Sequence, residues 1–471
     1  MWIYIPDTDE EKQPWVGTIS SHEVPNSWWD FELIRHVDAK DNYRTAPFED
    51  RATVLGLLDH QQPCTLIRPF VHHVDPGSLG ARTVPRTLIK GQFEALLSNL
   101  GIENADEKVF STISFESDSF SVWYAGRMYT KDFDVNTRTH NLKIMETERK
   151  ELDVLELGRV TCTSGVKVSG QGQSGEITSA SVFRLDYSKL ASLNEVIDNC
   201  VGLERLFGFL IGFRGKPPVF NVWQNKTYKI GEYDLRYDGK LDISGINWTK
   251  GTPPHRMNCV HLNGRGGATL ESILPNFFDN AEDIVTRIHA VEFSRFFSNN
   301  LSERFSVIMP VLESYIKGKY IEGDERSYMD SEKAFFEYID KSNSELIAEF
   351  AKKHIQVKDR KAPSLKTQLA RAIDNINSYG FSFPKKMADR IQNRRARMFH
   401  SAPQMIEDDG RNFFDEICAA TGLLMLHTYR DLGVDIASLA HGYSALSDFR
   451  QFLIIPTGKA KAGNAGDGPT T

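Results

Sequence analysis

The residues best suited to chemistry lie in one basic segment, Arg394-Arg395-Ala396-Arg397-Met398-Phe399-His400. A histidine can act as a general acid or base near neutral pH, because its unperturbed pKa is about 6.5. An arginine can hold the charge of a phosphorane, because its planar guanidinium matches the phosphate oxygens. Together they could cut RNA without a metal. A base takes the ribose 2′-OH proton, the oxygen attacks phosphorus, and an acid protonates the leaving 5′-oxygen. The alternative is an ordinary basic helix whose histidine packs or caps the helix end.

Positive charge gathers around this segment. Residues 351–400 contain 13 Lys and Arg but only three acidic residues, an excess of ten positive charges. The whole chain carries −7, so the remainder carries about −17. A basic surface on an acidic protein favours a polyanionic ligand, with nucleic acid as the first candidate, although a solvated helical face would look similar. We predict that the phosphates are bound by Arg394, Arg397, Arg390, Lys385 and Lys386.

Two other motifs are weaker. Gly170-Gln-Gly-Gln-Ser-Gly175 matches the dinucleotide pattern G-x-G-x-x-G, but the residues that follow alternate like a strand, where a dinucleotide site needs a helix. We therefore predict a hairpin turn. His72-His73-Val74-Asp75 could supply metal ligands, yet adjacent histidines in a strand point to opposite faces and no second ligand cluster has a metal-binding spacing. We expect no metal and no other cofactor.

The N-terminal part, residues 1–272, has the texture of a β-rich domain. Short runs rich in Val, Ile, Phe, Tyr and Thr alternate with turn residues, which indicates a sandwich or distorted barrel with one or two helices. Strands are predicted at 52–58, 65–74, 120–129 and 181–185, with strand-like texture across 218–237. Apolar residues at helical spacing predict one helix over 189–213.

Residues 273–445 predict an all-α bundle of four or five helices. An apolar stripe runs from Phe305 to Ile316, and Pro310 should kink or restart that helix. Ser364 should cap the next well-marked helix, which Gly380 stops. The basic helix then ends at His400, and a last long helix covers 412–432. Further helices are predicted after Ser331 and around residue 346, and a disordered tail at 456–471.

The length and composition fit this division. A chain of 471 residues predicts at least two domains, and 40% hydrophobic with 25% charged residues is ordinary for a globular protein. No apolar run approaches 18 residues, and the first residues turn acidic at once, so we expect neither a membrane helix nor a secretory signal. The five scattered cysteines indicate free thiols in a reducing compartment. We therefore expect a cytoplasmic protein.

The C-terminal half resembles a HEPN domain, the helical bundle of many ribonucleases, whose signature is Arg-x4–6-His at a helix end. Arg395 with His400 gives the x4 spacing and Arg394 with His400 gives x5. Before the motif come helices that carry Leu312-Glu313-Ser314 and Leu365-Lys-Thr-Gln-Leu369, and a closing apolar helix follows it.

The β-rich N-terminal half opens Trp15-Val-Gly-Thr-Ile-Ser20, and with the C-terminal half it is similar to the ApeA-like anti-phage HEPN proteins. One position departs from that family. The residue after the motif arginine is usually polar, whereas Ala396 stands here. Glu313 and His427 could line the same cleft, although single polar residues on amphipathic helices are more often ordinary surface or core-edge positions.

The resemblance implies a metal-independent endoribonuclease of an anti-phage defence system, with His400 as acid or base and Arg395 stabilising the phosphorane. The substrate would be RNA, either tRNA or other phage or host transcripts, and its products would carry 2′,3′-cyclic phosphate and 5′-OH ends. The N-terminal domain would sense a trigger, such as a phage-derived one, or restrain the nuclease. No membrane partner is expected. The alternative is an inactive HEPN scaffold that binds RNA or protein.

The spacing of the motif bears on its assembly. At about 100° per residue, Arg395 and His400 lie about 140° apart around a regular helix, whereas Arg397 and His400 lie about 60° apart. Arg397 is thus the better partner of His400 within one chain. Arg395 could converge with His400 only if the helix frays near Ser401 or if a second subunit contributes. Two copies would also supply both an acid and a base, and HEPN nucleases form such composite sites, so we expect a homodimer or a higher even homo-oligomer.

Overall fold

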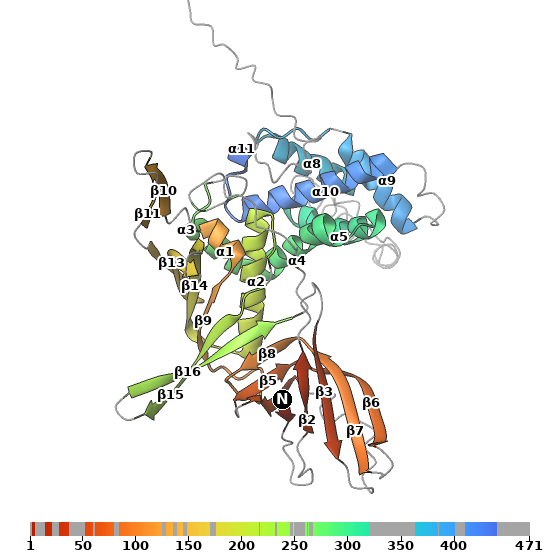
Figure 1. Ribbon diagram of the computed structural model, residues 1–471. Helices are drawn as coiled ribbons and strands as arrows, with labels where there is room; N and C mark the ends of the chain where they lie inside the picture. The colour runs from red at the N-terminus through yellow and green to blue at the C-terminus, as the bar shows by residue number, and fades with distance from the viewer. Residues whose placement is uncertain are drawn as a thin grey trace, which may run out of the picture. The chain divides into compact units, whose positions relative to one another are not determined.

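The computed structural model divides the chain into two compact units, Met1–Ala281 and Glu282–Thr471 (Figure 1). It describes residues 2–4, 15–20, 28–36, 52–59, 62–79, 84–124, 129–134, 139–144, 148–169, 176–215, 217–230, 233–244, 248, 260, 262, 267–320, 363–384, 386–400 and 410–439. The strands occupy the first unit and most helices the second. This confirms the predicted order of a β-rich region followed by a helical one.

Fourteen of the described strands form one antiparallel sheet. Its order is β12-β13-β14-β9-β15-β16-β8-β5-β4-β1-β2-β3-β7-β6, so β12 and β6 stand at its two ends and these strands do not close into a barrel. The strands are β1 (Trp2–Tyr4), β2 (Trp15–Ser20), β3 (Trp29–His36), β4 (Thr53–Leu57), β5 (Pro63–Ile67), β6 (Phe70–Leu79), β7 (Val84–Phe93), β8 (Ala95–Ser98), β9 (Phe110–Glu116), β12 (Arg149–Val154), β13 (Gly158–Ser169), β14 (Glu176–Ala191), β15 (Phe220–Ile230) and β16 (Tyr233–Ile243). A separate hairpin pairs β10 (Tyr129–Asp134) with β11 (Thr139–Ile144).

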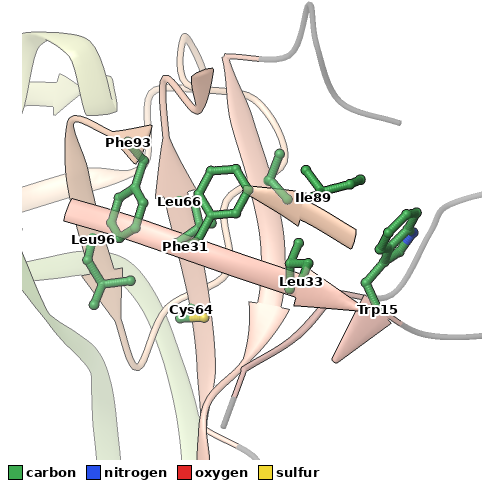
Figure 2. Close-up of a cluster of buried hydrophobic side chains, with 9 residues drawn as sticks. Trp15, Phe31, Leu33, Cys64, Leu66, Ile89, Phe93 and Leu96 are labelled. Carbon is green, nitrogen blue, oxygen red and sulfur yellow. The ribbon is translucent and has the colours of Figure 1, made fainter. Parts of the chain in front are cut away.

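One half of this sheet is built around its own apolar cluster (Figure 2). The cluster draws alternate, inward-facing residues from β2, β3, β4, β5, β7 and β8, as expected for strands with one buried face. Its buried members are Trp15, Phe31, Leu33, Val54, Cys64, Leu66, Ile89, Phe93 and Leu96. The predicted strand at 65–74 is in fact two strands, because the chain turns between Ile67 and Phe70 with Arg68 at a φ of 49°.

The strand predicted at 120–129 is wrong in its first part. Residues Asp118–Tyr124 form a helix, α1, whose start is held by the Ser117 hydroxyl, which accepts a hydrogen bond from the Phe120 backbone N–H at 3.0 Å. Phe120, Trp123 and Tyr124 are all buried, and their spacing is that of one helix face. Aromatic residues favour strands in isolation, but burial of this face decides the local structure.

The helix predicted over 189–213 is confirmed as α2 (Leu193–Ile211), while residues 189–191 still belong to β14. Ser192 and Glu195 form a capping box at its start, and Gly212 ends it in the left-handed conformation. The Gly170–Gly175 motif lies outside the described residues. The strands on either side, β13 and β14, pair antiparallel as far as Ser169 and Glu176, as the hairpin interpretation predicts.

The described helices after the sheet are α3 (Leu270–Asp279), α4 (Ala281–Glu292), a π-helical turn (Phe293–Phe297), α5 (Leu301–Lys319), α8 (Leu365–Asn377), α9 (Met387–His400), α10 (Gly410–Asp431) and α11 (Ile436–Leu439). Ser364 caps α8 as predicted, since its hydroxyl accepts from the Thr367 N–H. No described helix is long and apolar enough to cross a membrane. The helices predicted after Ser331 and near residue 346, and the tail at 456–471, lie outside the described residues, and the predicted number of bundle helices stays a prediction.

Pro310 lies inside α5, which continues through it, so of the two predicted effects, a kink or a restart, the restart does not occur. Both Pro310 and Ser306, whose carbonyl would have accepted the missing hydrogen bond, lie on the exposed face. Water can therefore satisfy that carbonyl, and the helix is preserved by its buried stripe, which includes Phe305, Leu312 and Ile316.

A buried charged cluster joins α4, α5 and α10 within the second unit. Arg287 is 2% exposed and its Nη1 lies 2.7 Å from Asp431 Oδ2. The Tyr315 hydroxyl donates to the same carboxylate at 3.3 Å and accepts from Arg430 Nη2 at 3.0 Å. His427 is fully buried and its ring contacts the rings of Tyr315 and Tyr320.

Replacement of Asp431 by asparagine should lower the free energy of unfolding at neutral pH by about 2–3 kcal/mol, since hydrogen bonds to charged groups are worth roughly 1.5–3 kcal/mol. Burial alone raises the pKa of Asp431, but the hydrogen bond and charge of Arg287, together with the charges of Lys319 and Arg430, more than offset it, so the pKa lies below its ordinary value. A lowered carboxyl pKa stabilises the fold above the unfolded-state pKa of about 3.9, and this stabilisation is lost as the pH falls through the folded pKa.

Urea unfolding between about pH 7 and pH 2 measures this, and the gap between wild type and variant should close toward low pH. Asp283→Asn is the matched control. Asp283 also contacts Arg287, at 3.0 Å, but is 67% exposed, so its loss should change stability little. Equal stability of wild type and Asp431→Asn at pH 7 would show that the ion pair between Asp431 and Arg287 does not stabilise the fold.

Candidate active site

The helix α9 sets the direction of each motif arginine. Met387, Ile391 and Arg394 are buried and recur at intervals of four and three, so Arg394 lies on the stripe that faces the rest of the unit. Arg395 is one residue farther round and is half-buried. The two adjacent arginines therefore meet different helices.

Arg394 is held between two residues of α10. Its Nε lies 2.7 Å from Glu416 Oε2, and the two side chains are only 5% and 6% exposed. Its guanidinium also lies over the Phe413 ring, at 4.6 Å from the centroid. Arg390 contacts the same carboxylate, at 3.3 Å, and donates to the Asn412 carbonyl at 3.1 Å. Glu416 thus fastens α9 to α10 through two arginines.

Arg395 turns instead to α5. Its Nε and Nη2 donate to the two carboxylate oxygens of Glu313 at 3.1 and 3.2 Å, a two-point contact that fixes the guanidinium plane. Lys317, one helical turn along, contacts Glu313 at 2.7 Å. The Arg395 side chain as a whole is 33% exposed, so it is not closed off from solvent.

The other predicted site residues differ in how much of them the structure describes. Arg397 and Lys386 are exposed. Lys385 lies outside the described residues, and of His400 only the backbone is described, as the last residue of α9. Because α9 stays helical through His400, Arg395 and His400 lie about 140° apart around the helix axis. The helix is continuous as far as His400, and Ser401, near which fraying would bring Arg395 and His400 together, lies outside the described residues.

His427 is too deeply buried to take part in a reaction with a ligand. Burial, with the nearby positive charge of Arg430, lowers the pKa of His427 to about 3. This histidine is thus neutral at physiological pH and has no contact with solvent, so it cannot serve as the second acid or base.

The two acidic partners of the arginines had unequal signals in the sequence. Glu313 was a candidate for the cleft and does contact Arg395. Glu416 was missed, although a carboxylate beside Phe413 and Ile417 on an apolar helix face is a signal for a buried cationic partner. No group of three or more His, Cys, Asp or Glu within the described ranges is placed to hold a metal ion.

One comparison with known proteins bears on these observations. The model of the ApeA N-terminal domain 1 matches residues 2–257, which is more than half of the chain and includes all fourteen strands of the sheet. No curated protein and no solved structure matches the chain. Because the match spans most of the β-rich unit and over half of the whole sequence, the chain belongs to the ApeA family.

Proposed function

We propose that this protein is a metal-independent endoribonuclease of an anti-phage defence system, with Arg395 and His400 in its active site. The observation that carries the proposal is the placement of Arg395. Its side chain is part-exposed, its guanidinium is fixed in a plane by Glu313, and it lies five residues before a histidine at a helix end. Membership of the ApeA family supports the role in defence. His400 moves the proton and Arg395 stabilises the phosphorane as its charge develops.

Phosphate binding is divided among the remaining basic residues. Arg397 and Lys386 are exposed and suited to the RNA backbone, together with Lys385. Arg390 has a side chain that is one-third exposed, so it could add a phosphate contact beside its bonds to Glu416 and Asn412. Arg394 is buried in an ion pair with Glu416. Its main contribution is therefore to hold α9 against α10 rather than to bind phosphate.

The proposed site is completed by a second copy of the chain. The separation of about 140° between the positions of Arg395 and His400 on a continuous helix favours a second copy as the source of the other half of the site. A two-fold axis beside α9 would bring each arginine to the partner copy's motif and would place two histidines together, one as base and one as acid. A homodimer is therefore part of the proposal.

A second candidate function is a scaffold that binds RNA or protein without cutting. The observation in its favour is Ala396, which is exposed and offers no polar group next to the motif arginine. An RNA-binding scaffold would share the RNA affinity of the nuclease but would leave the RNA uncut, whereas a protein-binding scaffold would show neither RNA affinity nor cleavage.

Product chemistry tests the proposal most directly. The full chain is incubated in EDTA with total tRNA and a single-stranded RNA, and with the same RNA carrying 2′-O-methyl groups. We expect the unmodified RNA to be cut into fragments with 2′,3′-cyclic phosphate and 5′-OH ends, while the methylated RNA stays intact because it lacks the attacking oxygen. Two results would contradict the proposed mechanism. One is cleavage that occurs without EDTA but not with it, and the other is cleavage that the 2′-O-methyl groups do not affect.

A further inference from the structure

The first unit contains a cavity of about 780 Å³ that the proposed nuclease chemistry does not use. It lies between the start of α2, the end of β14, the turn that joins β12 to β13, and the end of α3. Tyr187, Leu190 and Phe278 provide apolar surface in it. Its volume is in the range of sites that take a small molecule or a few residues of a peptide.

The charges around the cavity favour a cationic ligand. Its lining contains four carboxylates and two lysines. Lys108 pairs with Glu195 at 3.2 Å, which leaves Glu156, Asp198 and Asp279 against Lys189. The lining thus carries a net charge of −2.

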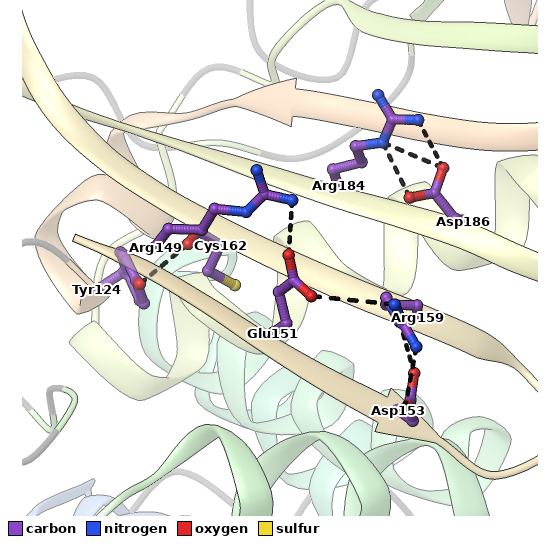
Figure 3. A network of polar contacts seen from close by, with 8 residues as sticks. All are labelled: Tyr124, Arg149, Glu151, Asp153, Arg159, Cys162, Arg184 and Asp186. Atoms are coloured by element: carbon purple, nitrogen blue, oxygen red, sulfur yellow. Dashed lines mark hydrogen bonds and ion pairs between the residues drawn. The ribbon is translucent and has the colours of Figure 1, made fainter. Parts of the chain in front are cut away.

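Charges elsewhere on the same unit are arranged differently. On the exposed face of β12, β13 and β14, the arginines and carboxylates neutralise each other in close pairs (Figure 3). Arg159 Nε, for example, lies 2.8 Å from Asp153, and Arg184 Nη2 lies 2.7 Å from Asp186. Asp198 and Asp279 form no such ion pair within the described residues. Their negative charge is therefore available to attract a cationic ligand.

The rim of the cavity carries Leu155, which is 94% exposed. Leu155 stands on a tight turn that is fastened to β14, because Ser188 donates from its hydroxyl to the Glu156 carbonyl at 2.6 Å and from its N–H to the Leu157 carbonyl at 2.9 Å. Gly158 closes the turn with a φ of 143°, and a Cβ there would lie 2.0 Å from the Asp186 carbonyl oxygen. A leucine held in water by a fixed turn is placed to contact a partner that reaches beyond the cavity itself.

We propose that this cavity binds a polypeptide segment that carries both basic and aliphatic side chains. A basic side chain meets Asp198 and Asp279, and an aliphatic side chain packs between Leu155 and Phe278. A polypeptide rather than a small cation is indicated by Leu155, which stands at the rim with almost all of its surface in solvent. The binding needs no RNA, so its test is independent of the test of the proposed nuclease activity.

Calorimetric titration of the full chain with acetyl-Lys-Leu-Lys-Leu-Lys-amide tests this site. Leu155→Ser should weaken binding about tenfold through the lost apolar contact, and Asp198→Lys should do the same through charge reversal. Both side chains are exposed, so the variants should fold. The matched controls are Val182→Ser and Asp238→Lys, two exposed positions outside the cavity lining, which should bind within about twofold of wild type.

The comparison ligands decide between the alternatives. The proposal requires that acetyl-Glu-Leu-Glu-Leu-Glu-amide and acetyl-Lys-Ser-Lys-Ser-Lys-amide each bind at least about tenfold more weakly than the basic leucine peptide. Spermidine that binds as tightly as the peptide would identify a small-cation site and overturn it. So would absence of any heat at about 1 mM peptide, or peptide binding that neither Leu155→Ser nor Asp198→Lys changes.

Discussion

Replacement of His400 by alanine should lower the rate of RNA cleavage by about 10²–10⁴-fold, the usual contribution of one general acid or base. Two such histidines would meet in the proposed composite site and the variant removes both from a homodimer, so this range is the smallest loss that we expect. RNA affinity should stay within about twofold of wild type, because affinity comes mainly from the phosphate contacts of the basic residues. Cleavage of tRNA and single-stranded RNA in EDTA, with gel-shift titration of the same RNAs, measures both quantities.

His289→Ala is the control for this variant. His289 also lies on a helix of the second unit and is partly exposed, but it belongs to α4 and not to the motif. His427 would be a poor control, because it is fully buried and its loss would leave a void among Tyr315 and Tyr320. Equal cleavage by wild type and His400→Ala would show that the motif histidine does no chemistry in this chain.

The sequence predicts well those features that depend on neighbours along the chain. Ser364 and the apolar stripe of α5 follow from local capping and helical spacing, and both are present. The first part of the strand predicted at 120–129 is wrong because Phe120, Trp123 and Tyr124 favour strands as residue types, while their burial on one helix face depends on the rest of the unit.

The candidate site also depends on contacts between residues that are far apart in the sequence. The spacing to His400 alone could not choose between Arg394 and Arg395, because the two positions differ only in their partners on other helices. Those partners, Glu416 and Glu313, lie 22 and 82 residues away. A helical projection does contain part of the answer, since Met387, Ile391 and Arg394 share one stripe. The ion pairs that follow from this register become visible only when α5, α9 and α10 are packed.

Arg395→Ala should mainly lower the cleavage rate, whereas Arg394→Ala should mainly lower the free energy of unfolding, although the two residues are adjacent. Arg395→Ala should lower the cleavage rate by about 10²–10³-fold, the loss typical for one group that stabilises developing negative charge. Its effect on stability should be about 1 kcal/mol or less, because the ion pair with Glu313 is part-exposed. Arg394→Ala should lower the free energy of unfolding by about 3–5 kcal/mol, because it leaves the Glu416 carboxylate buried without its closest partner.

The two variants are compared by urea unfolding and by cleavage at a temperature where both are folded. Arg394→Lys and Arg395→Lys serve as matched controls that keep the charge but lose the planar fork. The Arg395→Lys variant should recover little cleavage if the phosphorane is held at two points, whereas the Arg394→Lys variant should recover part of the lost stability, because its ammonium can still pair with Glu416. If Arg394→Ala removes cleavage without loss of stability while Arg395→Ala still cuts RNA, the catalytic arginine is Arg394. The x5 spacing to His400 is then the operative one, and the contact between Arg395 and Glu313 serves only to join α9 to α5.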